Sequence, residues 1–430
     1  MGVPVLILNF RLKSIKLVIF IILSASILTQ TAVKKEKNVC ISCHLETGEK
    51  ALIQPVEDFT KKENDKFLDV HAYAGLSCHN CHGGDPTNED RAKDESAGYI
   101  GKPKPKDIPA LCSKCHSDIE YIKQFNPRLP TDQFYSYQTS IHGKRLKEGD
   151  RKVASCVSCH NAHGIRFIKD PASPVYPKNI PNTCSRCHSD EEYMKGYNIP
   201  TNQFKNYTQS KHGQMLLEQG DITAPNCATC HGSHGAVPPG VSAVYQICGQ
   251  CHTQQEEYFS KSSHAKAFQE AKKPGCVTCH GMHEIPTPTA EMMSNKPGSI
   301  CMLCHKEGDH CYMAVDKMKN TFNDVNIKLT QANEILEKAT KLGMDVEKAK
   351  FSLNEVKDFV TKARIKVHQF KEEVVLEELK KAVEIIDSAI KRGQKALQEW
   401  QYRRIGLGIS LILILLTIIS LILKIRTLKE

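Results

Sequence analysis

The 430-residue sequence has no proline after Cys311, no charged residue from Ile405 to Leu423, and only one cysteine outside a single repeated motif. Because proline interrupts helices, its absence leaves the C-terminal segment free to form long ones. The uncharged run of nineteen residues is too uniform for a helix of a soluble core and is long enough to span a membrane. The motif takes up eighteen of the nineteen cysteines and always ends in histidine, which a disulfide framework would not require.

The repeated motif is CxxCH, and it occurs nine times, as CISCH, CHNCH, CSKCH, CVSCH, CSRCH, CATCH, CGQCH, CVTCH and CMLCH. It is the attachment signature of haem c: each thiol adds to one vinyl group of the porphyrin, and the adjacent histidine takes an axial position on the iron. Zinc ribbons also repeat CxxC pairs, but zinc needs no histidine after every second cysteine. The sequence therefore predicts nine covalently bound haem c groups.

The predicted attachment residues follow directly from the motif. The attachment cysteines are Cys40, Cys43, Cys78, Cys81, Cys112, Cys115, Cys156, Cys159, Cys184, Cys187, Cys227, Cys230, Cys248, Cys251, Cys276, Cys279, Cys301 and Cys304. The proximal iron ligands are His44, His82, His116, His160, His188, His231, His252, His280 and His305.

Each haem has very little polypeptide available to surround it. The motifs run from Cys40 to His305, which leaves roughly thirty residues per haem, rich in Gly, Pro, Ser, Asn and Lys. We therefore expect stacked porphyrins to form the core, wrapped in short helices and irregular loops, and the haem-free chain to be largely unfolded there. The formal charge of +10 does not indicate a nucleic-acid partner, because nine ferric bis-histidine haems with their propionates add about −9.

A repeat of about seventy residues underlies the array. IPALCSKCHSDIEYIKQF, starting at Ile108, returns as IPNTCSRCHSDEEYMKGY at Ile180, and FYSYQTSIHG returns as FKNYTQSKHG. Each repeat carries a first CxxCH, a lone histidine in an S-x-H-G setting, and a second CxxCH extended to CxxCHxxHG. A shorter copy begins at Cys248 and a degenerate one at Cys40, so the array consists of four two-haem repeats and a ninth haem at Cys301.

Histidines that recur in register with the haems are the predicted distal ligands, because imidazole is the usual sixth ligand of an electron-transfer haem. One class precedes the second motif of each repeat, and another lies three residues after an attachment histidine. His79 is the predicted replacement in the first repeat, which has CHGGD, and His310 serves near the last haem. His368 is predicted to be polar surface and Cys311 a free thiol. The predicted distal ligands are His71, His79, His142, His163, His212, His234, His264, His283 and His310, with their pairing to irons left open.

Both ends of the chain are hydrophobic. Arg11, Lys13 and Lys16 precede an apolar run of twelve residues, which predicts a signal peptide or an uncleaved N-terminal anchor over residues 1–32. At the other end, residues 403–430 are predicted to be a transmembrane helix with a short cytoplasmic tail, whose basic residues satisfy the positive-inside rule. The haem domain would then be periplasmic or otherwise extracytoplasmic.

Between the haems and the membrane lies a segment dominated by Lys, Glu, Ala, Leu and Val, with three heptad seams. Gly343 separates the first seam from the second, and residues 368–373 separate the second from the third. We expect an antiparallel three-helix bundle over residues 312–402, after a nonahaem domain over residues 33–311. The predicted fold is thus mainly α with much irregular loop: a haem-stacked domain, a helical bundle and a C-terminal transmembrane helix.

The CxxCH array and its accompanying histidines make residues 40–311 resemble the multihaem cytochromes c of the doubled-CxxCH type, found in bacteria and archaea. That superfamily includes periplasmic electron-transfer cytochromes, quinol dehydrogenases, and enzymes that convert nitrite or hydroxylamine. The resemblance implies haems close enough for rapid tunnelling. The lysine-ligated CxxCK motif of nitrite reductases is absent here.

Nine haems against nine plausible distal histidines favour an electron carrier over a catalytic oxidoreductase, with no catalytic residue assigned. The expected partners are redox proteins or a membrane quinol oxidoreductase, no nucleic acid, and the membrane through the C-terminal helix; no oligomeric state follows. Two alternatives stay open. One is a reductase or oxidase of a small nitrogen or sulfur compound with one open haem, and the other is a quinol dehydrogenase held at the membrane by an uncleaved N-terminus.

Overall fold

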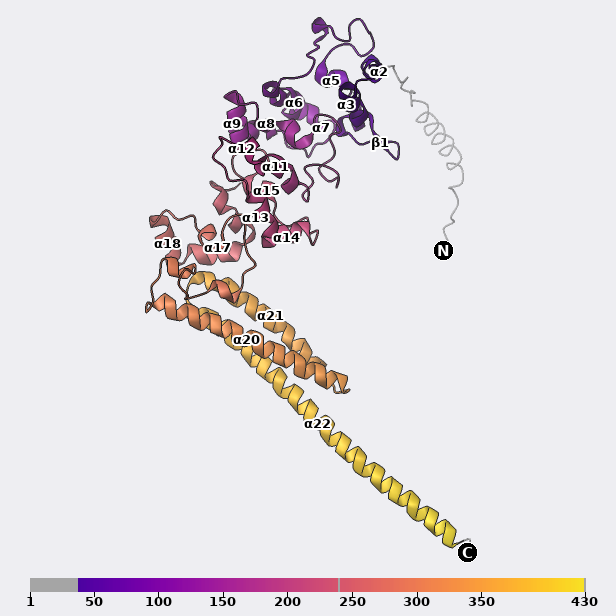
Figure 1. Cartoon of the computed structure of the whole chain (residues 1–430), viewed down its shortest axis with the longest axis vertical. Coiled ribbons are helices and arrows are strands. Elements are labelled where there is room, and N and C mark those ends of the chain that lie inside the picture. The colour runs from indigo at the N-terminus through magenta and orange to yellow at the C-terminus, as the bar shows by residue number, and fades with distance from the viewer. Residues whose placement is uncertain (1–37, 239, 429–430) are drawn as a thin grey trace, which may run out of the picture. The chain divides into compact units, whose positions relative to one another are not determined.

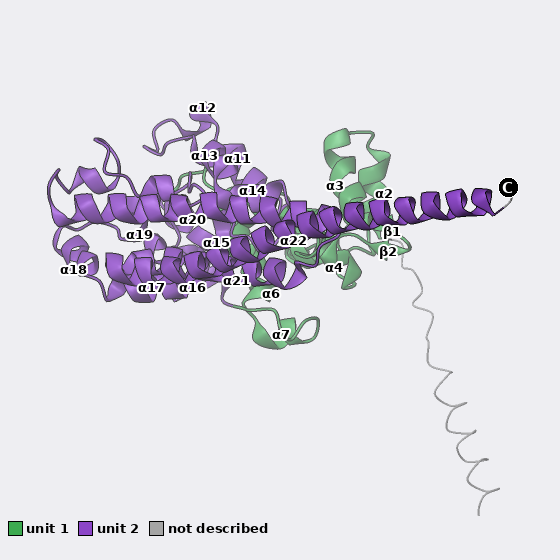
Figure 2. Ribbon diagram, turned by 90° about the horizontal axis from the view of Figure 1, so that it is seen from below, with its two compact units in different colours: residues 1–131, 149–173 green, residues 132–148, 174–430 purple. Residues whose placement is uncertain are grey.

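The computed structural model describes residues 38–238 and 240–428, so the predicted signal peptide or anchor lies outside the described residues. The chain divides into two compact units, residues 1–131 with 149–173 and residues 132–148 with 174–430 (Figure 2). The described part is mainly helical, with one antiparallel pair of two-residue strands in which Lys62 lies opposite Phe67. The predicted class, mainly α with much irregular loop, agrees with this structure.

The first unit contains short elements joined by long loops. Its elements are α2 (Val39–Glu46), α3 (Lys50–Thr60), β1 (Lys62–Glu63), β2 (Lys66–Phe67), α4 (Val70–Tyr73), α5 (Cys78–His82), η1 (Glu95–Ala97), η2 (Pro105–Asp107), α6 (Ile108–His116), α7 (Ile119–Lys123) and α10 (Cys156–His160).

The second unit begins with similar short elements and ends in three long helices (Figure 1). The short elements are α8 (Gln133–Thr139), α9 (Ile141–Lys147), α11 (Ile180–His188), α12 (Glu191–Met194), α13 (Gln203–Gln209), α14 (Lys211–Leu217), α15 (Cys227–His231), η3 (Val244–Gln246), α16 (Cys248–Cys251), α17 (Thr253–Ser260), α18 (Ser263–Glu270), α19 (Cys276–His280), η4 (Ala290–Met292) and η5 (Cys301–Leu303). The long helices are α20 (His310–Lys341), α21 (Glu347–Lys366) and α22 (Glu372–Thr427), with the single turn η6 (Val367–Gln369) between the last two.

Buried apolar side chains are scarce in the part of the chain that carries the motifs. Among the described residues before α20 they are only Val39, Val56, Ala72, Ile122, Leu146, Met194, Leu216 and Ala224. Several hundred residues normally bury a far larger apolar core. The polypeptide alone therefore does not provide the interior of this region, which fits the expectation that a large apolar cofactor fills it.

The long helices have a conventional core instead. Their heptad positions are buried, and several are fully inaccessible, including Val325 on α20, Val356 on α21 and Ile386 on α22. α22 packs along both other helices, whereas α20 and α21 contact each other much less. Gly343, at φ +76°, ends the first helix as predicted, and the second break falls at η6 and Phe370.

α22 is one continuous helix of 56 residues, so no break separates the bundle from the apolar run (Figure 1). Within the described chain it is the one helix that is long and apolar enough to cross a membrane, and its most apolar window is not buried against the protein. From Glu372 to Ile405 the helix rises about 50 Å at 1.5 Å per residue.

Candidate functional site

The CxxCH motifs lie on short helical segments, most of which end at the attachment histidine. α5, α10, α15 and α19 consist of the five motif residues alone, and α6 and α11 end on the motif. A helical turn brings residues i and i+3 to the same face, so both thiols of a motif point to one side. Ser77, Ser155 and Asn226 form capping boxes that start three of these helices just before the first cysteine.

The lone histidine of each repeat occupies the second position of another short helix. The residue two places before it is the N-cap in all four repeats: Asp69, Ser140, Ser210 and Ser262. Ser140 and Ser210 each accept a hydrogen bond of 3.0 Å from a glycine N–H, that of Gly143 or Gly213. A Cβ at Gly143 would collide with the carbonyl oxygen of Tyr137, which explains why glycine follows this histidine.

Seven attachment histidines each lie opposite a second imidazole ring. Among the described residues, these pairs have ring centres 5.9–6.2 Å apart. The pairs are His116 with His71, His82 with His163, His188 with His142, His252 with His212, His231 with His283, His305 with His264, and His280 with His368.

These separations fit a metal ion between the two rings. An imidazole nitrogen lies about 1.1 Å from its ring centre and about 2.0 Å from a bound metal, so two rings on opposite sides of one ion have centres about 6 Å apart. Rings stacked directly face to face lie closer, as His264 and Phe370 do with centres 3.7 Å apart. The donor set, two imidazoles beside a CxxC pair, is the one that a bis-histidine haem c requires.

The pairs follow one rule along the repeats. The lone histidine of one repeat faces the first attachment histidine of the next, as His142 faces His188 and His264 faces His305. The histidine of CxxCHxxHG faces the second attachment histidine of the preceding repeat, as His283 faces His231. Neighbouring repeats therefore contribute rings to each other's pairs, and the repeat pattern gives His234 the position of His163 and His283.

Thiols of neighbouring motifs lie close enough to shift each other's pKa. Burial, and after it the nearby Cys115, raises the pKa of Cys81, so the second motif of one repeat meets the first motif of the next. Within repeats the interacting first cysteines are Cys40 and Cys78, Cys112 and Cys156, Cys184 and Cys227, and Cys248 and Cys276. Between repeats Cys230 meets Cys248, and Cys279 meets Cys301. In each compact unit the attachment sites thus form a series without a gap.

Burial keeps most of the ring-pair histidines neutral, and it has the same effect on His234. Desolvation is the main cause of the lowered pKa of the imidazoles of His116, His142, His163, His188, His212, His231, His234, His264, His280, His283 and His368. A neutral imidazole has a nitrogen lone pair available for a metal, whereas a protonated one does not.

The second ring nitrogen of several histidines is held by a specific acceptor. Nδ1 of His82 lies 2.8 Å from the carbonyl oxygen of Gly101, and Nδ1 of His44 lies 3.2 Å from that of Leu52. His305 differs, because its Nδ1 lies 3.0 Å from the carboxylate of Asp309. Such partners orient a ligating ring, and a carboxylate makes it a stronger donor.

His305, Asp309 and Cys311 bring three potential metal ligands within 4.8 Å of one another. The contact between His305 and Asp309 explains this cluster as the surroundings of an attachment histidine. Burial, followed by the nearby Cys301, raises the pKa of the Cys311 thiol to about 11, so it stays protonated at neutral pH.

Three predictions made from sequence meet different structural outcomes. His310 is exposed at the start of α20, and the ring opposite His305 is that of His264. His79 is partly buried, with Nδ1 buried and lacking a hydrogen bond in the described structure. His368, predicted to be polar surface, instead lies 6.0 Å from His280 with the rings inclined by 21°. The sequence does contain one indication of this position for His368. No CxxCHxxHG histidine follows the fourth repeat, so His280 has no partner ring from a following repeat.

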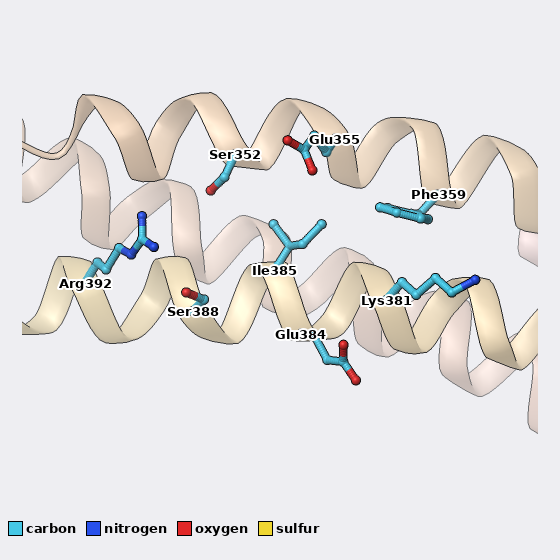
Figure 3. Close-up of a pocket in the computed structure, with 8 residues that line it drawn as sticks. All are labelled: Ser352, Glu355, Phe359, Lys381, Glu384, Ile385, Ser388 and Arg392. Atoms are coloured by element: carbon cyan, nitrogen blue, oxygen red, sulfur yellow. The ribbon is translucent and has the colours of Figure 1, made fainter.

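A groove in the bundle lies between α21 and α22 (Figure 3). Its lining residues are Ser352, Glu355, Phe359, Lys381, Glu384, Ile385, Ser388 and Arg392. No cysteine or histidine lines it, so it offers neither a haem-attachment group nor an imidazole ligand.

The comparisons with known proteins agree with this site over part of the chain. Residues 70–189 match the cytochrome c3 family, a group of multihaem c-type cytochromes. This range holds four of the CxxCH motifs, so it is a cytochrome c3-type domain with covalently bound haem c, a cofactor of electron transfer. No curated protein and no solved structure matches the chain.

Proposed function

We propose that this chain is a membrane-anchored, exported c-type cytochrome that carries electrons through nine bis-histidine haems between a membrane donor and extracytoplasmic acceptors. The observation that carries the proposal is the set of seven opposed imidazole pairs, each at the separation of two axial ligands. Haem iron supplies reversible one-electron chemistry when bound. Two firmly held imidazoles keep substrates off the iron, so electrons pass while no bond is made or broken.

The order of the attachment sites supports conduction along the chain. Within each compact unit, adjacent motifs meet through their first cysteines within a repeat and through the second cysteine between repeats, as at Cys248 with Cys276 and Cys279 with Cys301. Cofactors attached in this order would form an uninterrupted series in each unit, as conduction requires. Ring pairs formed across a repeat boundary, such as that of His142 and His188, also hold those segments together.

The length of α22 bears on the choice of donor. About 50 Å of helix separates Glu372, beside the α21–α22 turn, from the start of the apolar run at Ile405. An upright bundle would hold the last two haems beyond the reach of a quinol in the membrane. A soluble or membrane-bound redox protein that contacts the haem domain directly is therefore the proposed exchange partner.

The test is to produce the full chain in a host that attaches haem c and to compare its mass with that of the haem-free chain. A mass increase of nine haems is expected, together with low-spin spectra for every iron and full reduction by one strong reductant. Fewer haems, or a chain that remains partly oxidised because some irons are isolated, would contradict the proposal.

A second function, reduction of a small nitrogen or sulfur compound, would lie at the first motif. Among the described residues no ring contact pairs a second imidazole with His44, and the lone histidine of the first repeat, His71, faces His116 instead. His79 is the sequence's own candidate for that place. A high-spin iron that binds nitrite or hydroxylamine in the native chain, and is lost in Cys40→Ala/Cys43→Ala, would favour this enzyme over the simple carrier.

A further inference from the structure

The turn between the second and third helices of the bundle contains a histidine, His368. The cytochrome c3 match ends at residue 189, so it assigns no role to this turn. We propose that His368, in η6, is the distal ligand of the iron attached at Cys276, Cys279 and His280. This inference rests on the proposed function, because it takes that motif to hold a haem. It makes the helical bundle a part of the haem site.

The geometry of the pair of His280 and His368 matches that of the other pairs. Its ring centres are 6.0 Å apart, within the range of 5.9–6.2 Å that the six other pairs show. Its rings are inclined by 21°, similar to the 14° of His231 and His283 and the 17° of His82 and His163. A histidine that only covered the surface would not be expected to place its ring centre at this distance from the ring of His280.

The His368 ring is also presented in the form that binds a metal. Nδ1 lies 2.9 Å from the carbonyl oxygen of Ile365, which can only accept a hydrogen bond, so Nδ1 carries the proton. Nε2 of the neutral ring then keeps its lone pair. The same arrangement, with Nδ1 held by a backbone carbonyl, occurs at His82.

The repeats explain why a ligand is needed from this segment. The second attachment histidines of the first and third repeats, His82 and His231, face a histidine of the following repeat. The fourth repeat is the last, so no CxxCHxxHG histidine follows His280 to complete its pair. After His310 the sequence contains one histidine, His368, and the structure places it at this position.

Further contacts hold the turn against the haem region. Phe370 has a left-handed backbone, φ 54°, and its ring stacks on His264 with centres 3.7 Å apart. His264 is itself the ring opposite His305, so the turn reaches the ligands of two neighbouring motifs. On the bundle side, Lys366 lies 2.7 Å from the buried carboxylate of Glu378, which fixes the end of α21 to α22.

The test compares His368→Ala with Gln369→Ala in the full chain. Gln369→Ala disturbs the same turn but leaves the imidazole in place. We expect His368→Ala to keep the haem count of the native chain, to convert one iron to the high-spin form, and to bind one carbon monoxide per chain when reduced. Added imidazole should restore the low-spin form. Gln369→Ala should bind carbon monoxide no faster than the native chain does.

A second variant, which replaces the imidazole by another iron ligand, distinguishes loss of ligation from a folding defect. His368→Met should give one iron with histidine and methionine ligands and a raised reduction potential, because methionine is a weaker donor to ferric iron. If neither variant changes the spin state, carbon monoxide binding or any potential, the inference is overturned while the proposed function stands. If the native chain itself lacks haem at the eighth motif, as peptide mass mapping would show, the proposed function fails first.

Discussion

The Asp309 carboxylate lies 3.0 Å from Nδ1 of His305, and its other oxygen accepts a hydrogen bond from the backbone N–H of Tyr312 at the start of α20. One side chain thus caps the first helix of the bundle and holds the attachment histidine of the ninth motif. Hydrogen bonds from Tyr312 and Lys306, together with His305, keep the pKa of this carboxyl below its usual value. It is therefore charged at neutral pH.

Asp309→Asn should raise the reduction potential of one haem. Asparagine still caps a helix, but it removes the charge that makes His305 a stronger donor to ferric iron. A tenfold shift in the ferric–ferrous equilibrium, about 59 mV, is the expected size. Spectroelectrochemical titration of the full chain measures it. Asp190→Asn is the control, because Asp190 lies two residues after His188 but caps α12 through Tyr193. Equal titrations of the native chain and Asp309→Asn would show that Asp309 only caps the helix.

Ser140→Ala should loosen the ligand at His142. The Ser140 hydroxyl caps the helix on which this histidine sits, and losing such a cap costs about 1 kcal/mol. That energy corresponds to a roughly fivefold larger population of molecules in which His142 has left the iron attached at His188. Carbon monoxide should therefore bind the reduced chain about fivefold faster at that iron. Ser140→Thr keeps the hydroxyl and should bind at the native rate. If Ser140→Ala binds carbon monoxide at the native rate, the cap does not affect how firmly His142 binds the iron.

The attachment sites and the lone histidines could be predicted from sequence because both are local. A CxxCH motif places its thiols within one helical turn, and the S-x-H-G pattern encodes a cap, a histidine on the helix and a close approach to Tyr137. The two breaks in the bundle were also local, at Gly343 and beside Phe370.

The pairing could not be predicted, because it depends on how consecutive repeats stack. His142 faces His188 in the next repeat, and no sequence signal near either residue indicates this pairing. His368 was missed for a further reason. Its neighbours are charged and helical, so its local sequence resembles a solvated surface, and nothing local indicates that its ring faces His280.

The chain made without haem should keep its bundle and lose the rest. The region before α20 buries few apolar side chains, whereas the bundle has its own continuous core, including Leu336, Leu353 and Leu379. The free energy of haem binding then stabilises the folded state of the region before α20 only, and the bundle folds without it. Limited proteolysis of a chain with every motif changed to SxxSH should leave a protected fragment that begins near His310. Protection of the motif region without haem would contradict the idea that porphyrin forms its core.

The stability of the bundle should depend on pH through Glu378. Hydrogen bonds from Lys366 and Lys381 hold the pKa of this buried carboxyl below its usual value. A group with a depressed folded pKa stabilises the protein above its unfolded pKa, about 4.3, and this contribution is lost as the pH falls through the folded value. Glu378→Gln should cost about 1.5–3 kcal/mol at pH 7 and much less near pH 3. Thermal unfolding followed by circular dichroism measures the difference. Glu384→Gln, at an exposed position on the same helix, should change little at either pH.

Removing residues 403–430 should release the mature protein from the membrane without changing its haem spectrum. The apolar run of α22 packs against no other described part of the protein, so its loss removes no contact with the attachment sites. A chain ending at Tyr402 should appear in the aqueous fraction, and a chain ending at Leu423, which keeps the run but not the basic tail, should stay with the membrane. Fractionation followed by haem staining measures both. If the chain ending at Tyr402 stays membrane-bound in high salt, the N-terminal segment is an uncleaved anchor, and the first haem lies near the membrane where a quinol can reduce it.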